Sequence, residues 1–580
     1  MILQALTRHY ETLVRRGEIA APGWGPVKVS YALCIAADGT LERVISVQTE
    51  QVRGKKTVLA PQIFSLPAPV KRTVGVAANF LCDNASYFLG ADNKGKPART
   101  AQCFAVCKAL HEQLLQAVDT PAARAVLAFF RNWDPAQAQT QPALAAVWED
   151  ILAGANLIFR HANAYVHDDP AVRQAWEQHY GAASDAPAGR CLVTGENAPI
   201  ESTHPAIKNV AGAQSSGAAL VSFNAPAFCS YGKEQNFNAP TGQYASFAYT
   251  SALNHLLADR DHVYRIGDAT VVCWAENGAP AYNILFGGAT FGAPAAYSDT
   301  DFFGMVKALC AGQPVTFEEE KLDRSTEFYV LGLSPNAARL SVRFFLHNSF
   351  GAFLDNIAEH CERLEIVRPS YDKTPALSVW RLLNETVNQN ARDKSPAPNL
   401  AGETVRAVLN DTRYPATLLN GVTLRIRAER EVTRGRAAIL KAYYIKNPHP
   451  DVPKEVLTVS LNPDATHAPY LLGRLFSVLE AIQSAANPGI NATIKDKYFN
   501  SAAATPALVF PTLIGLAQKH LKKLGGSAKG LAVSYDKQLG ELLDKLGTDF
   551  PARMNLQQQG SFQLGYYQQT QARYQKKEEN

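Results

Sequence analysis

The segment "VKVSYALCIAADGTLERVISVQ", residues 27–48, decides the fold class of the first part of the chain. Apolar residues alternate on both sides of Asp38 and Gly39, which predicts two antiparallel strands joined by a tight turn. Before this segment, the apolar residues of 2–14 recur at helical spacing, and Gly17 ends the helix. Together these patterns indicate an α+β region.

The same region continues to about residue 366. An Ala/Leu-rich stretch at about 100–181 predicts a helical insertion, and "YASFAYTSALNHLLAD" (244–259) predicts another helix. Further strands are predicted in "TVLAPQIFSLP" (57–67), "RCLVTGE" (190–196), "AALVSFN" (218–224), "HVYRIGDATVVCWAE" (262–276) and "TEFYVLGLSPNAARLSVRFFLHN" (326–348).

Beyond Pro369 every apolar pattern has a helical period. A Pro-rich break, "NPHPDVP" (447–453), precedes the last group of helices. We therefore expect an α+β N-terminal region with a helical insertion, followed by an all-α C-terminal helical bundle. The expected domains are 1–366, a basic helical linker at 367–460, and a bundle at 461–580.

Composition narrows the class of protein only broadly. The 580 residues are 47% hydrophobic and 19% charged, with a net charge of +5, which many enzymes share. Nine cysteines occur without a C-x-x-C pair, which suggests free thiols in a reducing compartment. No apolar run approaches the ~20 residues of a membrane span, so we expect a cytoplasmic protein without a membrane partner.

The loop "GADNKGKP" (90–97) matches the spacing of a phosphate-binding loop, G-x-x-x-x-G-K. Pro97, however, stands where Ser or Thr should hold Mg²⁺. A nucleotide-dependent enzyme remains the alternative function, but a surface loop is favoured. Its cations Lys94 and Lys96 are then available to a nucleic-acid backbone.

Other patterns that could carry catalysis or metal binding are incomplete. Ser215 and Ser216 lack the G-x-S-x-G of a nucleophile elbow. Cys103 and Cys107 lie four residues apart on a predicted helix without two further ligands in sight, which favours core thiols. We therefore predict no catalytic residue, no metal site and no cofactor.

The stretch "GAQSSGAALVSFNAPAFCSYGKEQNFNAP" (212–240) has the composition of a nucleic-acid reader. Glycines let a backbone approach a groove closely, while Ser, Asn and Gln side chains can bond to base edges and phosphates. Lys233 can neutralise a phosphate, and the aromatic residues can wedge or stack. An inert tight turn leading into a strand remains the alternative.

Two C-terminal segments are locally basic. Residues 404–446 carry nine cations and three acids, and residues 474–529 carry seven cations and two acids. Such segments can be solvated faces, but an electrostatic track for a phosphate chain suits the asymmetry better.

Several long blocks also resemble a known family in the same order. They include "PGWGPVKVSYAL" (22–33), "ANFLCDNASYFLG" (78–90), "GLSPNAARLSVRFF" (332–345), "PYLLGRLFSVLE" (469–480) and "PGINATIKDKYF" (488–499), together with the stretch 212–240. The chain thereby resembles the large subunit of the type I-C CRISPR surveillance complex, Cascade, over nearly its whole length.

The resemblance implies an RNA-guided DNA-binding assembly in which this subunit is not an enzyme. The large subunit is expected to recognise a short protospacer-adjacent motif (PAM) in duplex DNA, to start unwinding and R-loop formation, and to recruit a separate helicase-nuclease. Its bundle is expected to hold the displaced strand. The expected partners are guide RNA, target DNA, the backbone and guide-end-capping subunits, and a small subunit. An architectural scaffold without base reading is the other alternative.

Individual contacts are assigned as hypotheses. For the PAM they are Asn79, Phe80, Asn84, Gln214, Ser215, Ser216, Lys233, Gln235 and Asn236. For the DNA backbone they are Lys71, Arg72, Lys94, Lys96, Lys495, Lys497, Lys519, Lys522 and Lys523.

Overall fold

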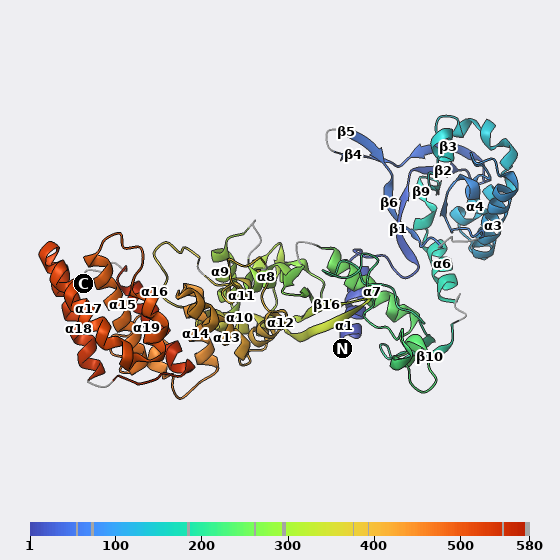
Figure 1. The fold of residues 1–580 in the computed structure, drawn as a ribbon. Coiled ribbons are helices and arrows are strands. Elements are labelled where there is room, and N and C mark those ends of the chain that lie inside the picture. The colour runs from blue at the N-terminus through green and yellow to red at the C-terminus, as the bar shows by residue number, and fades with distance from the viewer. Residues whose placement is uncertain are drawn as a thin grey trace. The chain divides into compact units, whose positions relative to one another are not determined.

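The computed structural model describes residues 1–53, 56–70, 75–182, 186–259, 263–292, 297–374, 376–392, 394–547 and 550–574. The chain divides into two compact units (Figure 1). The first contains residues 1–205 and 222–252, and the second contains residues 206–221 and 253–580. The domain boundaries predicted at 366 and 460 stay predictions.

The first unit begins with the predicted helix, α1 (Ile2–Arg15), which buries Leu6, Tyr10 and Leu13 and is followed by Gly17 at φ +74°. The predicted hairpin is confirmed as β2 (Tyr31–Ile35) and β3 (Leu41–Ser46), paired antiparallel.

These two strands belong to a sheet of order β3-β2-β8-β7, to which β9 is added. The remaining strands are β7 (Cys82–Asp83), β8 (Leu157–His161) and β9 (Ala164–Tyr165). Because β8 pairs parallel with β2, the stretch 100–181 is not wholly helical as predicted. Leu157, Ile158 and Phe159 of β8 are all buried. Their continuous apolar run therefore belongs to a strand at the centre of the sheet and not to a helix.

Other strands of this unit form small antiparallel pairs. They are β1 (Trp24–Val29) with β6 (Gln62–Pro67), β4 (Thr49–Arg53) with β5 (Lys56–Ala60), and β10 (Ala188–Arg190) with β11 (Asn197–Pro199). The helices are α2 (Ala85–Phe88), α3 (Pro97–Leu115), α4 (Pro121–Asn132), α5 (Trp148–Leu152), α6 (Pro170–Ala182) and α7 (Gln243–Ala258), within which the division between the units falls.

The strand predicted in "RCLVTGE" is wrong. Residues 191–196 form a turn, in which the Cys191 Sγ accepts backbone N–H groups of Val193, Thr194 and Gly242. These donors lower the pKa of the Cys191 thiol against the opposing effect of burial. The strand predicted in "AALVSFN" is also wrong, because only isolated bridges form at Ala218 and Ala219.

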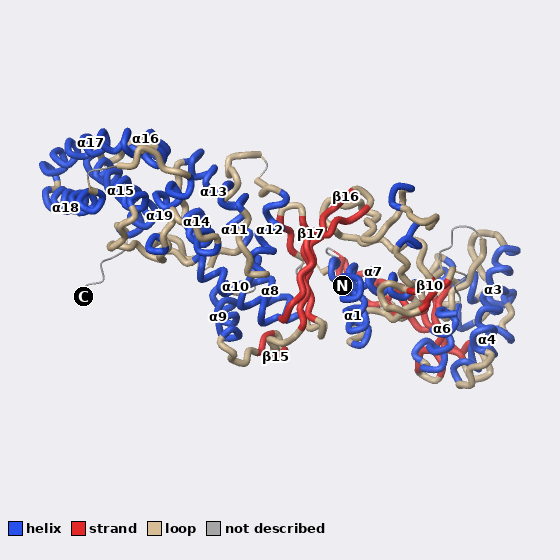
Figure 2. The backbone as a smooth tube through the Cα atoms, turned by 90° about the horizontal axis from the view of Figure 1, so that it is seen from below, coloured by secondary structure: helices blue, strands red, loops and turns tan. Residues whose placement is uncertain are grey.

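The second unit is built on a four-stranded antiparallel sheet of order β12-β13-β16-β17. Its strands are β12 (Tyr264–Ile266), β13 (Ala269–Ala275), β16 (Glu327–Asn336) and β17 (Arg339–Ser349). Figure 2 shows β16 and β17 as a long twisted pair. A short hairpin, β14 (Thr316–Phe317) and β15 (Glu320–Lys321), precedes them.

Helices make up the rest of the second unit. They are α8 (Pro280–Phe291), α9 (Asp299–Cys310), α10 (Phe350–Leu364), α11 (Val379–Asn384), α12 (Pro398–Leu409), α13 (Ala416–Glu429) and α14 (Arg434–Lys446), then α15 (Ala468–Ala486), α16 (Ile494–Ala504), α17 (Pro506–Ser527), α18 (Lys529–Leu546) and α19 (Leu556–Ala572). One hydrophobic core runs from the sheet to the last helices. The predicted fold class, α+β followed by a helical bundle, is therefore confirmed.

Within the described ranges, no helix combines the length and the apolar character needed to cross a membrane.

Candidate nucleic-acid interface

The turn Gly212–Gly217 lies in the second unit and presents its polar residues to solvent. Gln214, Ser215 and Ser216 are all exposed. The Gly217 N–H donates to the Gln214 carbonyl over 2.9 Å, and Gly217 has φ +97°. A Cβ at Gly217 would lie 2.8 Å from the Ile207 carbonyl oxygen, so only glycine fits this closure of the turn.

This turn is anchored on the four-stranded sheet. The Ala211 N–H donates to the Thr270 Oγ1 over 3.0 Å. Downstream of the turn, the Ala219 N–H donates to the Ala338 carbonyl over 3.0 Å, and the Leu340 N–H donates to the Ala219 carbonyl over 2.9 Å. The turn therefore stands beside the connection between β16 and β17 on a fixed support.

That connection adds two polar residues missed in the sequence. Asn336 is exposed at the end of β16, and Arg339 is half-buried at the start of β17. Between them, Ala337 has φ +53°, which closes the hairpin tightly. The motif "SPNAAR" (334–339) has the polar residues of a hairpin tip, and this much is visible in the sequence. Its proximity to residues 212–217 is not, because it depends on a long-range bridge between Ala219 and Arg339.

The second half of the predicted reader belongs to the first unit. Lys233 and Gln235 are exposed, whereas Asn236 is only 2% exposed, and its N–H donates to the Ser202 carbonyl over 3.3 Å. Asn236 is therefore a buried structural residue, and its prediction as a PAM contact is corrected. Lys233 and Gln235 belong to the first unit, whereas the 212–217 turn belongs to the second.

The segment "NFLCDN" (79–84) has structural roles in the first unit. The Asn79 Oδ1 accepts the Val70 N–H over 2.9 Å, and the Asn84 Oδ1 accepts the Ser86 N–H over 3.1 Å as the N-cap of α2. Phe80 is 1% exposed and stacks on Trp176 with ring centroids 5.6 Å apart. Phe80 is therefore a core residue, and its prediction as a PAM contact is corrected. Asn79 and Asn84 are half-buried, and their predicted PAM contacts stay predictions.

A buried histidine supports this segment. His111 Nε2 accepts the Leu81 N–H over 3.0 Å, and His111 Nδ1 lies 2.8 Å from the Cys107 carbonyl oxygen. Burial lowers the pKa of His111 to about 4. The imidazole is therefore neutral, with its proton on Nδ1, and Cys103 and Cys107 are buried beside it as core thiols.

The loop "GADNKGKP" does not have the setting of a nucleotide site. It follows the helix α2, whereas a phosphate-binding loop follows a strand. The Asp92 carboxylate accepts the Thr100 hydroxyl and the Lys94 N–H, and these bonds lower the pKa of Asp92 despite opposing desolvation. Lys94 and Lys96 are exposed, as predicted for a surface loop. Lys71 and Arg72 lie outside the described residues.

The basic segment 404–446 is only partly exposed. Its buried or half-buried cations are Arg425, Arg434, Arg436, Lys441 and Lys446, whereas Arg406, Arg413, Arg427 and Arg430 are exposed, so a basic track stays a prediction for the exposed arginines alone. Arg436 is 3% exposed and its guanidinium lies against Glu385 and Glu429. Arg434 pairs with Asp372 at 2.9 Å, and the Lys441 Nζ donates to a main-chain carbonyl over 3.0 Å.

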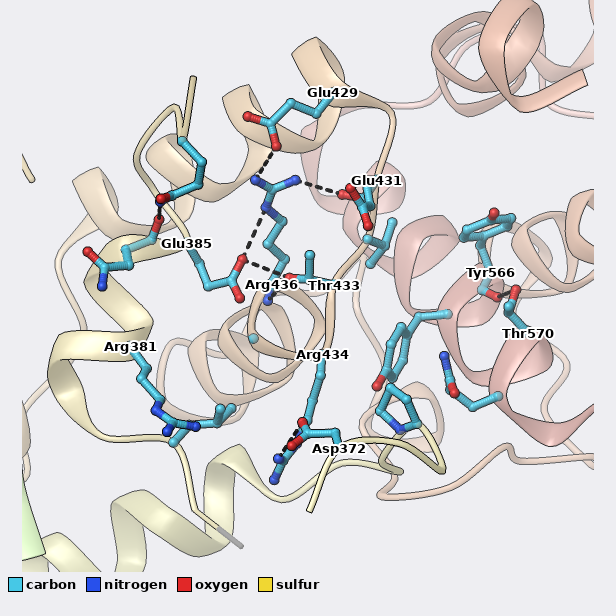
Figure 3. A pocket seen from close by; sticks show the side chains of 18 of the residues that line it. Asp372, Arg381, Glu385, Glu429, Glu431, Thr433, Arg434, Arg436, Tyr566 and Thr570 are labelled. Carbon is cyan, nitrogen blue, oxygen red and sulfur yellow. Dashed lines mark hydrogen bonds and ion pairs between the residues drawn. The ribbon is translucent and has the colours of Figure 1, made fainter. Parts of the chain in front are cut away.

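These ion pairs border a polar cavity of about 1000 Å³, in which Arg436 points between acidic side chains (Figure 3). Four cations and four carboxylates line it: Arg381, Arg434, Arg436, Lys495, Asp372, Glu385, Glu429 and Glu431. Burial raises the pKa of Glu385, although Thr433 and Arg436 oppose that rise. The lining is electrically balanced and does not favour a phosphate chain.

The second basic segment differs, because most of its cations face solvent. Lys497 on α16 and Lys519, Lys522 and Lys523 on α17 are exposed, while Lys495 is half-buried at the cavity. The Lys523 Nζ donates to the Asn487 Oδ1 over 2.7 Å. Arg474 departs from this pattern, since it is 8% exposed and its Nε donates to the Gln569 Oε1 over 3.0 Å.

In the part of the chain that the structure describes, no group of three or more His, Cys, Asp or Glu side chains is placed to hold a metal ion. His360 and Cys361 are adjacent residues of α10. The His360 Nδ1 lies 2.6 Å from the Tyr414 hydroxyl, so the imidazole has a tyrosine as its partner.

Comparison with known families gives the class of protein and then its family. The family model described as CRISPR-associated protein (Cas_Csd1) matches residues 6–574, so the chain is of the CRISPR-associated class. The chain belongs to the Csd1 family, the large-subunit family of type I-C, and is a Cascade-type component. The resemblance found in the sequence is confirmed at this level. A search of the curated proteins found no match.

Proposed function

We propose that this chain recognises the PAM in double-stranded DNA for its Cascade complex and starts strand separation there. The observation that carries the proposal is the exposed turn with Gln214, Ser215 and Ser216, held on a sheet beside Asn336 and Arg339. A rigid support matters because base-edge hydrogen bonds require defined donor and acceptor positions.

The chemistry of this surface suits a groove of duplex DNA. Gln214 offers a carboxamide that can both donate and accept, and the two serine hydroxyls can do the same. Arg339 can bond to a phosphate or to a guanine edge. Asn79 and Asn84, Lys233 and Gln235, and the loop cations Lys94 and Lys96 remain proposed additional contacts.

The exposed lysines of α16 and α17 are proposed to hold the displaced strand. Lys497, Lys519, Lys522 and Lys523 have the exposure that phosphate contact requires, and no compensating acid lies on α17. Guide RNA, the other Cascade subunits, a small subunit and a helicase-nuclease are the proposed partners. No catalytic role is proposed for this chain.

The test uses the assembled complex with its guide. Gln214→Ala should weaken binding to PAM-bearing duplex about 5- to 150-fold, equivalent to ~1–3 kcal/mol for a lost base contact. Binding to a target that is already opened should remain unchanged. The matched control is Gln113→Ala, at an exposed glutamine of α3. An equal loss on both targets, or no loss on either, would contradict the PAM assignment.

The lysine face has a separate test. Changing Lys519, Lys522 and Lys523 to Gln should reduce the salt dependence of R-loop binding by about 2 in slope, at ~0.7 per single-strand phosphate. The control removes the same charge at three exposed lysines elsewhere: Lys28, Lys321 and Lys454. Equal slopes for both triple variants would show that the α17 face is only solvated.

A further inference from the structure

The loop 228–235 of the first unit carries an aromatic side chain that projects fully into solvent. Tyr231 is 99% exposed, and Phe228 on the same loop is 40% exposed. A tyrosine ring in water loses the burial that usually stabilises it, so such a residue in a folded loop suggests an external partner.

The backbone of this loop is held in an unfavourable conformation. Tyr231 has φ +53° and Gln235 has φ +46°, on either side of Gly232 at φ +68°. Non-glycine residues rarely adopt this left-handed region, and a bulky residue such as tyrosine does so at a cost. Conformations of this kind persist where the surroundings enforce them, and they cluster at functional sites.

One asparagine enforces the conformation. The Asn238 Oδ1 accepts the Ser230 N–H over 2.8 Å, while its Nδ2 donates to the Lys233 carbonyl over 3.1 Å and to the Gln235 carbonyl over 2.9 Å. These three bonds close the loop across its base. The backbone that carries Tyr231 is therefore held in place before any partner arrives, which lowers the entropic cost of binding.

The neighbours of Tyr231 favour a nucleic-acid partner. Ser230 and Lys233 are exposed on the same loop as the ring and can contact a phosphate, and Gln235 can bond to a base edge. A phenol ring stacks on any nucleobase because every base presents a π face. The combination of ring, cation and amide on one short loop is that of a stacking site for a single unpaired base.

We propose that Tyr231 stacks on a base released from pairing beside the PAM and so stabilises the first opened step of the target. This inference rests on the proposed function and adds to it a residue that makes no contact with the PAM itself. It separates the reading turn at 212–217 from the element that holds an opened base.

The experiment measures base opening directly in the assembled complex. A target duplex carries the fluorescent base 2-aminopurine at the first pair next to the PAM, and its unstacking from its neighbours is followed over time. Tyr231→Ala should slow opening about tenfold on the paired target and leave binding to a pre-opened target unchanged. Tyr231→Phe, which keeps the ring, should behave as the wild type.

Tyr371→Ala is the matched control, because Tyr371 is 85% exposed in the second unit. Opening by Tyr231→Ala at the wild-type rate would overturn the inference. So would a defect of equal size in Tyr231→Phe, or loss of another subunit from the Tyr231→Ala complex, since the ring would then bind protein. Wild-type opening that is independent of the PAM would instead refute the proposed function, and that result requires no Tyr231 variant.

Discussion

Alanine at Gly473 should destabilise the C-terminal bundle, whereas alanine at Gly540 in the same bundle should stabilise it. Gly473 lies on α15 where this helix crosses α19. A Cβ there would stand 1.9 Å from the Phe562 carbonyl oxygen and 2.8 Å from the Tyr566 nitrogen. These atoms are an i→i+4 backbone pair of α19, so the methyl group would press on that helix's own hydrogen bond.

The magnitude follows from opposing terms. Overpacking costs ~1–3 kcal/mol, and the upper end applies because a helix backbone cannot rotate away as a side chain can. Alanine regains ~1 kcal/mol over glycine in helix propensity. A net loss of about 2 kcal/mol remains for Gly473→Ala. For Gly540, no atom outside its own stretch of helix lies within 4 Å of the added Cβ, so only the gain of up to ~1 kcal/mol remains.

Native-state hydrogen exchange of the full chain is the suitable assay, because it reports the opening of α15 and α19 separately from the first unit. A loss of about 2 kcal/mol corresponds to roughly 30-fold faster exchange of their protected amides, and Gly540→Ala should slow exchange in α18. If Gly473→Ala exchanged no faster than the wild type, the close crossing of the two helices would be refuted.

Three other predictions concern the buried charges, the buried histidine and the reading turn. Glu385→Gln should lower the free energy of unfolding by ~1–3 kcal/mol, because Arg436 loses one of its two acidic partners and keeps Glu429; a denaturant midpoint equal to that of the wild type would contradict this. The free energy of unfolding should fall as the pH decreases from about 6.5 to about 4, because the unfolded chain protonates His111 whereas the fold keeps it neutral. The loss is at most ~1.4 kcal/mol per pH unit. His111→Gln should therefore reduce the slope of the denaturant midpoint against pH. Gly217→Ala should abolish PAM-dependent binding without changing binding to single strands, which filter binding to the two DNA forms can compare.

Sequence patterns predicted those elements that local interactions determine. The β2–β3 hairpin follows from alternation around Asp38 and Gly39, and α1 follows from its apolar spacing. Predictions were wrong where a distant group replaced the local preference. The segment "RCLVTGE" has strand-forming residues, but the Leu192 N–H donates to the distant Pro240 carbonyl, while the Val193 and Thr194 N–H groups donate to the Cys191 sulfur within a turn.

The proposed site was only partly accessible from sequence for a similar reason. Composition indicated the polar turn at 212–217, but it could not place Asn336 and Arg339 beside it, because Ala219 pairs with a strand more than a hundred residues away. Nor could composition distinguish the exposed Tyr231 from the buried Phe80. Residue type indicates what a side chain can bind, whereas exposure depends on long-range packing.

The basic segments show why local charge counts need the fold. Part of the cation excess of residues 404–446 is cancelled by Asp372 and Glu385, which neutralise Arg434 and Arg436 and lie earlier in the chain. Charge changes in the two basic segments should therefore have different effects. At Arg436 they should alter stability and leave the salt slope of nucleic-acid binding unchanged, whereas at Lys519 and Lys522 they should alter the slope and leave stability unchanged.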